Sequence, residues 1–103
     1  MSIEKNYLKS KPICKVKFIL PKQRAEGIKQ VHLVGTFNDW DLEAAMPLRK
    51  QKTGDYAATL SFSVGEQHEF RYLLDGEQWE NDEMADYYVP SHVSREENSV
   101  VII

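Results

Sequence analysis

Apolar and polar residues alternate along several short segments of the chain. Between Pro12 and Pro21 every second position is apolar, and lysines occupy two of the positions between: the apolar residues are Cys14, Val16, Phe18 and Leu20. A period of two is typical of a β-strand that covers a core with one face and meets water with the other. The same alternation predicts a strand over residues 31–35, in which Gly35 indicates a bulge or a close approach between backbones.

Further apolar rows predict more strands towards the C-terminus. These strands cover residues 56–63, 70–74 and 99–103. Pro47 makes the short apolar piece around it an edge or irregular element, because proline cannot donate a hydrogen bond to a sheet. The Asp75-Gly76 pair predicts a type I′ hairpin turn, after which the chain returns through Trp79.

Two segments lack this alternation. The polar stretch from Glu80 to Glu97 is predicted to be a long loop, and residues 1–10 are the only ones with a weak helical pattern, through Ile3 and Tyr7. Six to eight short strands without a long helical period predict an all-β fold of the sandwich type. A length of 103 residues is enough for one domain with a single core.

Charge is unevenly distributed along the chain. The formal net charge is -3, with seven Lys or Arg against one Glu up to Arg24 and eight acids against Arg95 alone from Asp75 to Glu97. We therefore predict that the first and last parts of the chain lie near each other and partly neutralise. Nucleic acid is not an expected partner, because phosphate binding needs a concentrated positive field.

Cysteine usage and hydropathy bear on the compartment. Cys14 is the single cysteine, so the fold must rest on its core without an internal disulfide, which suits a reducing cytoplasm. No segment approaches the ~20 apolar residues of a membrane span, and the start of the chain has no apolar run of the signal-peptide type. We expect a soluble cytoplasmic protein without a membrane partner.

Patterns of catalytic or metal-binding residues are missing from the sequence. His32, His68 and His92 are far apart, and the sequence has no phosphate-cradling glycine loop, nucleophile elbow or cysteine pair. Acids between Asp75 and Asp86 could in principle hydrolyse a sugar bond. Such a carboxylate needs a cleft and a raised pKa, whereas this polar loop is expected to be solvated. We predict no catalytic residue, no metal site and no cofactor.

Four residues form a candidate binding constellation. Trp40 lies in a polar turn, Trp79 follows the hairpin, Arg71 faces outward from the strand that feeds the hairpin, and Asn98 opens the last strand. One face of a glucose unit is lined with C–H groups and can lie on an indole ring. Arg71 and Asn98 could then hydrogen-bond the hydroxyl groups. Taken alone, each tryptophan fits the core as well as it fits a ligand site.

Several motifs follow one another in a specific order: Val34-Gly35-Thr36-Phe37-Asn38-Asp39-Trp40, Pro47-Leu48, Gly65-Glu66, the stretch from Glu69 to Gly76, Trp79 and Asn98. The series resembles the glycogen-binding domain of the AMP-activated protein kinase beta subunit. It is similar also to the N-terminal early-set domains of isoamylases and glycogen branching enzymes. The resemblance covers residues 13–103 and leaves residues 1–12 as an N-terminal extension. It implies an immunoglobulin-like sandwich of the early-set type that recognises α-1,4-linked glucan without cleaving it.

The resemblance also assigns roles. Trp40 and Trp79 match the two stacking tryptophans of the family, Arg71 falls on a lysine that contacts sugar hydroxyls, and Asn98 falls on a polar asparagine. Two stretches depart from the pattern. Kinase-type members place a leucine before the asparagine, where this chain has Ser94-Arg95-Glu96-Glu97, and Glu80-Asn81-Asp82-Glu83 adds acidity that a neutral-sugar groove does not need.

Two hypotheses of function follow. The first is a stand-alone, non-catalytic module that binds α-glucan, such as glycogen, starch or malto-oligosaccharide. It would do so as a monomer or homodimer, either alone or beside a separate glycan-active enzyme. The second is a protein-interaction or regulatory domain that has lost sugar binding and uses Trp40 or Trp79 for a protein contact, where tryptophan is also favoured.

Overall fold

The fold consists of β-strands and three single-turn 3-10 helices in the described residues, 3–91 and 96–103, of the computed structural model. The strands are β1 (Ile3–Tyr7), β2 (Ile13–Leu20), β3 (Val31–Gly35), β4 (Met46–Lys50), β5 (Tyr56–Ser63), β6 (Gln67–Leu74), β7 (Gln78–Glu80), β8 (Tyr87–Pro90) and β9 (Glu97–Ile102). The 3-10 helices are η1 (Lys22–Arg24), η2 (Thr36–Asn38) and η3 (Leu42–Ala44). The all-β prediction is confirmed. None of the described helices is long and apolar enough to cross a membrane.

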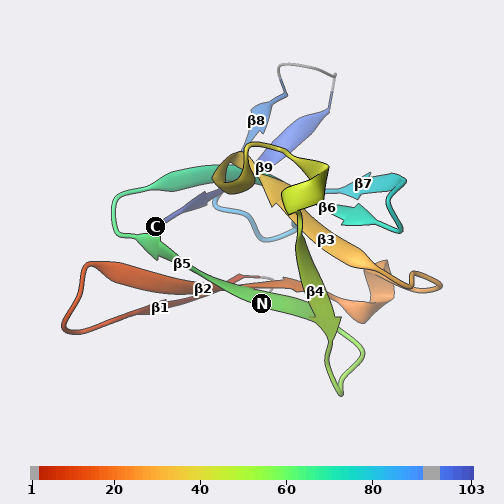
Figure 1. The fold of residues 1–103 in the computed structure, drawn as a ribbon, viewed down its shortest axis with the longest axis horizontal. Helices are drawn as coiled ribbons and strands as arrows, with labels where there is room; N and C mark the ends of the chain where they lie inside the picture. The colour runs from red at the N-terminus through yellow and green to blue at the C-terminus, as the bar shows by residue number, and fades with distance from the viewer. Residues whose placement is uncertain (1–2, 92–95) are drawn as a thin grey trace.

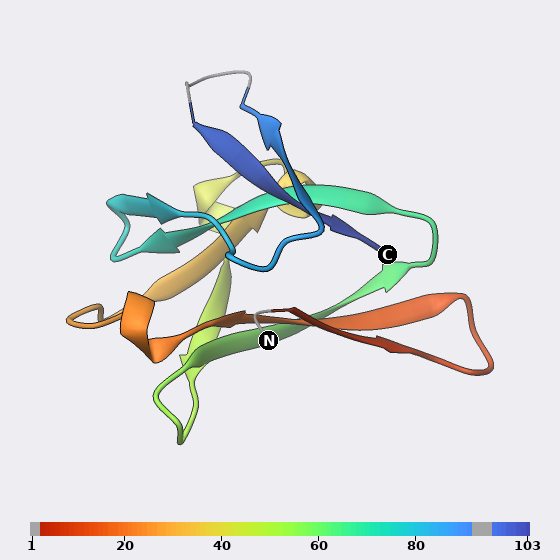
Figure 2. The same ribbon diagram turned by 180° about the vertical axis from the view of Figure 1, so that it is seen from behind.

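The strands form two antiparallel layers that are joined through β4. Their hydrogen-bonded order is β1-β2-β5-β4-β3-β6-β9-β8, with β7 added to β6. Residues 46–48 of β4 pair with β3, whereas Arg49 and Lys50 pair with β5. In Figures 1 and 2, β4 accordingly runs from the layer of β1, β2 and β5 to the layer that contains β3, β6 and β9. The predicted irregular element around Pro47 is this layer-switching strand.

The core lies between the two layers and is built from the alternating apolar rows. All four apolar residues predicted to face inward in β2 are fully buried. Phe18 occupies the centre, with its ring centroid 5.0 Å from that of Phe70 and 6.3 Å from those of Phe37 and Phe62. The contacts with Phe62 and Phe70 are edge-to-face, an arrangement that adds to the apolar burial that stabilises a sandwich.

Both edges of the sheet contain a strand that the sequence pattern does not reveal. Residues 3–7, where the only weak helical pattern occurs, form β1 and pair with β2. The prediction of an unbroken loop from Glu80 to Glu97 is wrong at residues 87–90, which pair with β9 as β8. Edge strands are short and mostly exposed, so alternation in them is weak. Pro90 fits β8 because an edge strand tolerates a missing N–H group.

The basic start of the chain neutralises part of its acidic end, as the charge distribution predicts. Lys5 Nζ lies 2.8 Å from Asp86 Oδ2, and Arg24 Nη2 lies 2.7 Å from Glu80 Oε2. These contacts join segments that are more than 50 residues apart. They fasten the β7–β8 connection to the opposite layer.

Gly35 allows β3 and β6 to approach closely, one of the two options that the sequence indicates. A Cβ atom at this position would stand 2.3 Å from the carbonyl oxygen of Glu69 and 2.8 Å from the ring of Phe37. The φ angle of Gly35 is −173°, which is ordinary extended backbone. The position therefore requires the absence of a side chain, not the conformational freedom of glycine.

We predict that Gly35→Ala lowers the free energy of unfolding by roughly 3 kcal/mol, at the upper end of overpacking costs. The reason is that the Glu69 carbonyl belongs to β6 and cannot retreat without disturbing its pairing with β3. Urea unfolding measures the change. The control is Gly27→Ala, which meets no atom within 4 Å and is expected to cost about 1 kcal/mol through its left-handed backbone. Equal losses in the two variants would contradict the prediction.

Candidate functional site

The layer of β3, β6 and β9 has an outer face that points away from the core. Residues directly opposite each other in antiparallel strands share a face. One row across β4, β3, β6 and β7 consists of Pro47, His32, Leu73 and Trp79. Leu73 alternates with the core residues of β6, so this whole row belongs to the outer face. Trp79 stands at its end on the edge strand β7 and is 38% exposed.

The next row of the outer face contains the predicted polar residues. Val34 of β3 lies opposite Arg71 of β6, and Asn98 of β9 lies opposite Val89 of β8. Arg71 Nε donates a hydrogen bond of 2.7 Å to Asn98 Oδ1, which closes the row between β6 and β9. The structure thus brings Arg71, Asn98 and Trp79 to one face, as their strand positions predict.

Apolar side chains form a floor beneath this face. Val34, Leu73 and Val100 are buried, yet they are not part of the core cluster between the layers. By strict alternation within residues 31–35 and 70–74, Val34 and Leu73 would lie on the wet side of their strands. One sequence signal could have revealed this floor. Val34 and Leu73 each stand next to apolar residues of the core face, and consecutive apolar residues indicate a strand that is buried on both faces.

Arg71 and Asn98 are held by acidic neighbours. Arg71 Nη1 lies 3.1 Å from Glu96 Oε2, and Asn98 Nδ2 donates to Glu69 Oε1 at 3.0 Å. Arg71 is 8% and Asn98 is 7% exposed, so both side chains are nearly buried although they face outward. The chain of contacts fixes the orientation of the Asn98 amide, because its oxygen accepts from the guanidinium while its nitrogen donates to the carboxylate. Residues 92–95, which include Ser94 and Arg95 of the departing stretch, lie outside the described residues.

Trp40 lies in the connection between β3 and β4, where η2 packs against β3 and β6. The amide of Asn38 fixes this connection by accepting from Gly35 N at 2.9 Å and donating to Leu33 O at 3.2 Å. A Schellman-type ending follows, in which Trp40 N donates to Gly35 O at 2.9 Å and Asp39 N donates to Thr36 O at 3.3 Å.

The backbone of Trp40 is unusual. Asp39 and Trp40 both have positive φ angles, 55° and 57°. Aspartate tolerates this left-handed region, but a bulky aromatic residue there is an outlier and stores strain. The Trp40 side chain is half-buried. Such strain is typical of functional loops, where the surrounding structure imposes the conformation.

Trp79 is positioned by the predicted hairpin. Asp75 and Gly76 both have positive φ angles, 51° and 70°, which confirms the type I′ turn. The carboxylate of Asp75 also accepts hydrogen bonds from the backbone N–H groups of Lys29 and Gln30, at 2.9 and 2.8 Å. The turn is therefore fastened to the segment that enters β3, and the place of Trp79 on the face is fixed relative to both strands.

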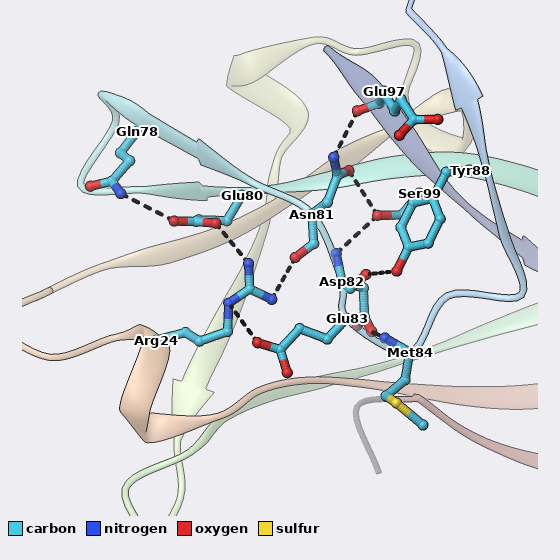
Figure 3. A network of polar contacts seen from close by, with 10 residues as sticks. All are labelled: Arg24, Gln78, Glu80, Asn81, Asp82, Glu83, Met84, Tyr88, Glu97 and Ser99. Carbon is cyan, nitrogen blue, oxygen red and sulfur yellow. Dashed lines mark hydrogen bonds and ion pairs between the residues drawn. The ribbon is translucent and has the colours of Figure 1, made fainter.

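One acid of the segment after Trp79 is buried, contrary to the expectation of a fully solvated loop, whereas Glu83 is exposed. Asp82 is 1% exposed and accepts a hydrogen bond of 2.6 Å from the Tyr72 hydroxyl. Figure 3 shows Arg24 reaching this segment, where it contacts Glu80 at 2.7 Å and Glu83 at 3.4 Å. For Asp82 the expectation is wrong, because the local sequence does not show which distant hydrogen-bond donors contact these acids.

Other backbone and side-chain groups complete this polar network. The backbone N–H of Asp82 donates to Ser99 Oγ at 2.9 Å, and Ser99 Oγ donates to Asn81 Oδ1 at 2.8 Å. The Tyr88 hydroxyl donates to the carbonyl of Asp82 (Figure 3). A buried carboxylate without such partners would be strongly destabilising. The network thus secures the path of the chain from β7 to β8.

Burial raises the pKa of the Tyr72 phenol well above its ordinary value, and the Asp82 carboxylate beside it adds to the effect. Both causes disfavour the phenolate.

The two histidines in the described part of the chain, His32 and His68, do not belong to a metal-binding cluster. His68 Nδ1 lies 2.9 Å from Thr36 Oγ1 and its Nε2 lies 2.8 Å from Glu66 Oε1. Within residues 3–91 and 96–103, no group of three or more His, Cys, Asp or Glu side chains is arranged to hold a metal ion. The hydrogen bond from His68 lowers the pKa of Glu66.

Two antiparallel layers with an exposed tryptophan beside a buried Arg–Asn pair are compatible with the class of all-β carbohydrate-binding modules. Residues 23–93 match the family model described as the glycogen recognition site of AMP-activated protein kinase, and the chain belongs to this family. The predicted resemblance to that kinase domain is confirmed. The matched range includes Trp40, Arg71 and Trp79, whereas Asn98 lies beyond its end. No individually curated protein matches the chain with significance.

The strain at Trp40 leads to a first prediction for this site. Trp40→Gly and Trp40→Ala both remove the ring, but only glycine adopts a φ of 57° without steric cost. We expect the glycine variant to be more stable than the alanine variant by about 1 kcal/mol, as measured by urea unfolding. The control is Lys17 in the extended strand β2, where alanine should be the more stable of the two. An alanine variant of Trp40 at least as stable as the glycine variant would refute the strain.

The raised pKa of Tyr72 leads to a second prediction. The folded protein holds the phenolic proton more tightly than the unfolded chain, so the stabilisation is complete below the unfolded pKa of about 10. It is lost as the pH rises from there towards the folded pKa. We expect an ultraviolet titration to show Tyr72 ionising last, together with alkaline unfolding.

Two variants sharpen this titration. Tyr72→Phe leaves the buried Asp82 without its phenol partner and should lower stability at neutral pH by about 1–3 kcal/mol. Tyr7→Phe removes an exposed phenol and should leave neutral stability unchanged. Ionisation of every tyrosine in a single step, with the fold intact, would contradict the assignment.

Proposed function

We propose that this protein binds α-1,4-linked glucan, such as glycogen, starch or malto-oligosaccharide, without cleaving it. Membership of a glycogen-recognition family supports the substrate class. The observation that carries the proposal is the position of Arg71, Asn98 and Trp79 on one outer face, with an apolar floor between the strands. Such a surface has one group that can stack and others that form directional hydrogen bonds.

Stacking on Trp79 supplies the apolar part of recognition. Its ring is exposed at the edge of the face, and the C–H side of a glucose unit can lie flat on it. Tryptophan has only two side-chain torsions, so its immobilisation costs little entropy. Trp40 is the second stacking residue in this proposal, held by the Asn38 amide and by the strained backbone that fixes its connection.

The polar part of recognition rests on the contacts around Arg71. Guanidinium and amide groups donate to sugar oxygens, and the exposed carboxylate of Glu96 accepts from sugar hydroxyls. Arg71 and Asn98 already form a hydrogen bond with each other, so both side chains are ordered before a ligand arrives. Less side-chain entropy is then lost on binding, and the affinity is reduced less. The apolar floor lowers the local dielectric and strengthens these hydrogen bonds.

Binding without cleavage is supported by the structural contacts that the acidic side chains make. Glycoside hydrolysis needs two carboxyl groups placed on either side of the bond, one of them with a raised pKa. In the acidic segment Asp82 is bonded to Tyr72 and to the backbone N–H of Met84, while Glu80 and Glu83 contact Arg24. These acids have structural partners, which leaves recognition as the function that we propose.

Titration with β-cyclodextrin and with maltoheptaose, followed by indole fluorescence and amide NMR shifts, tests the proposal. We expect saturable binding in the wild type. Trp79→Ala and Trp40→Ala should each weaken it at least tenfold, which corresponds to about 1.4 kcal/mol. Tyr7→Ala is the control, because Tyr7 is an exposed aromatic residue on β1 in the other layer and should leave affinity unchanged.

Two outcomes would count against the proposal. Absence of any saturable change at millimolar sugar would end it and favour a protein-interaction or regulatory domain. Binding that survives both tryptophan substitutions would retain the ligand but place it elsewhere on the molecule.

A further inference from the structure

Tyr87 is an exposed aromatic residue on the edge strand β8, which pairs with β9. It is 38% exposed, as Trp79 is. The two neighbouring tyrosines of β8 differ in their surroundings. The Tyr88 hydroxyl donates to the Asp82 carbonyl and belongs to the polar network, whereas within the described residues Tyr87 makes no side-chain hydrogen bond.

The pairing of the strands places Tyr87 on the outer face. Tyr87 lies opposite Val100 of β9, and Val100 lies opposite Glu69 of β6. Glu69 belongs to the outer face, because its carboxylate accepts from the Asn98 amide. Since opposite residues share a face, Tyr87 is on the same face as Arg71 and Asn98. Val100 extends the buried apolar floor towards it.

The backbone that carries Tyr87 is firmly held. Asp86 N donates to Val100 O at 2.9 Å. The Asp86 carboxylate accepts from Ile102 N at 2.6 Å and pairs with Lys5 at 2.8 Å. A stacking residue contributes most when the element that carries it is rigid, because less freedom is then lost on binding. The ring is therefore exposed on a fixed support.

Trp79 and Tyr87 lie towards opposite ends of β6 on the outer face. β7 and β9 both pair with the edge of β6 that faces away from β3. Because β8 lies beyond β9, the strands of Trp79 and Tyr87 are one spacing apart, which is about 5 Å. Along β6 the row of Trp79 meets Leu73 and the row of Tyr87 meets Glu69, a shift of about 13 Å. The two residues are thus about 14 Å apart along the diagonal, and the row of Arg71 and Asn98 lies between their rows.

We propose that Tyr87 is a further stacking residue, and that it extends recognition to longer α-glucan chains. The inference rests on the proposed function. A short oligosaccharide bound at Trp79 and Arg71 does not reach Tyr87, whereas a longer chain crosses β9 and lies against it. Because Trp79 and Tyr87 are separated in this way, we expect the protein to bind longer glucan chains more tightly than short ones.

The test compares wild type with Tyr87→Ala across maltotriose, maltopentaose, maltoheptaose and a longer maltodextrin fraction, by calorimetric titration. We expect Tyr87→Ala to weaken the longer ligands five- to tenfold and maltotriose less than twofold. Tyr87→Phe keeps the ring and should keep wild-type affinity throughout. NMR shifts of the Tyr87 ring protons in the wild type, expected with maltoheptaose and not with maltotriose, give a readout that does not depend on how a variant folds.

Several results would overturn the inference. Equal affinities of wild type and Tyr87→Ala for the longest ligand, or unmoved Tyr87 ring protons, remove Tyr87 from the site while the proposed function stands. A loss of the same size for every ligand removes the selection for chain length. Wild type that binds none of the sugars ends the proposed function itself, and that outcome is seen before any variant is measured.

Discussion

The register of β6 between β3 and β9 is the constraint on which the rest of the structure depends. This strand contributes Phe70 and Tyr72 to the core with one face and Arg71 and Leu73 to the outer face with the other. A slip of one residue would exchange the two sets, burying a guanidinium among aromatic rings and exposing those rings to water. The positions of the other strands of the outer face follow from how they pair with β6.

Contacts on both faces hold that register. On the inner side the Tyr72 hydroxyl bonds to the buried carboxylate of Asp82. On the outer side Arg71 bonds to Asn98. At one end the close approach at Gly35 admits no side chain between β3 and β6. Each of these contacts can form in only one register of β6. That register therefore fixes the core and the outer face together.

Sequence patterns predict the parts of this fold that repeat locally. Alternation reveals the central strands and places Arg71 outward, and the Asp75-Gly76 pair reveals the hairpin that positions Trp79. Contacts between distant residues have no such pattern. The bond between Arg71 and Asn98 joins positions 27 residues apart, and Asp82 reads as solvated until Tyr72 is brought beside it. The edge strands β1 and β8 are missed because their residues are largely exposed.

The acidity of the segment after Trp79 is a property of the inner structure and not of the outer face. Glu80 lies opposite Tyr72, so it points to the other side of the sheet from Trp79, which lies opposite Leu73. Arg24 then contacts Glu80 and Glu83, and Asp82 is enclosed. On the outer face the guanidinium of Arg71 lies beside the carboxylate of Glu96. A face on which charges are paired in this way suits a neutral ligand, because an ionic ligand would have to compete with the existing pair.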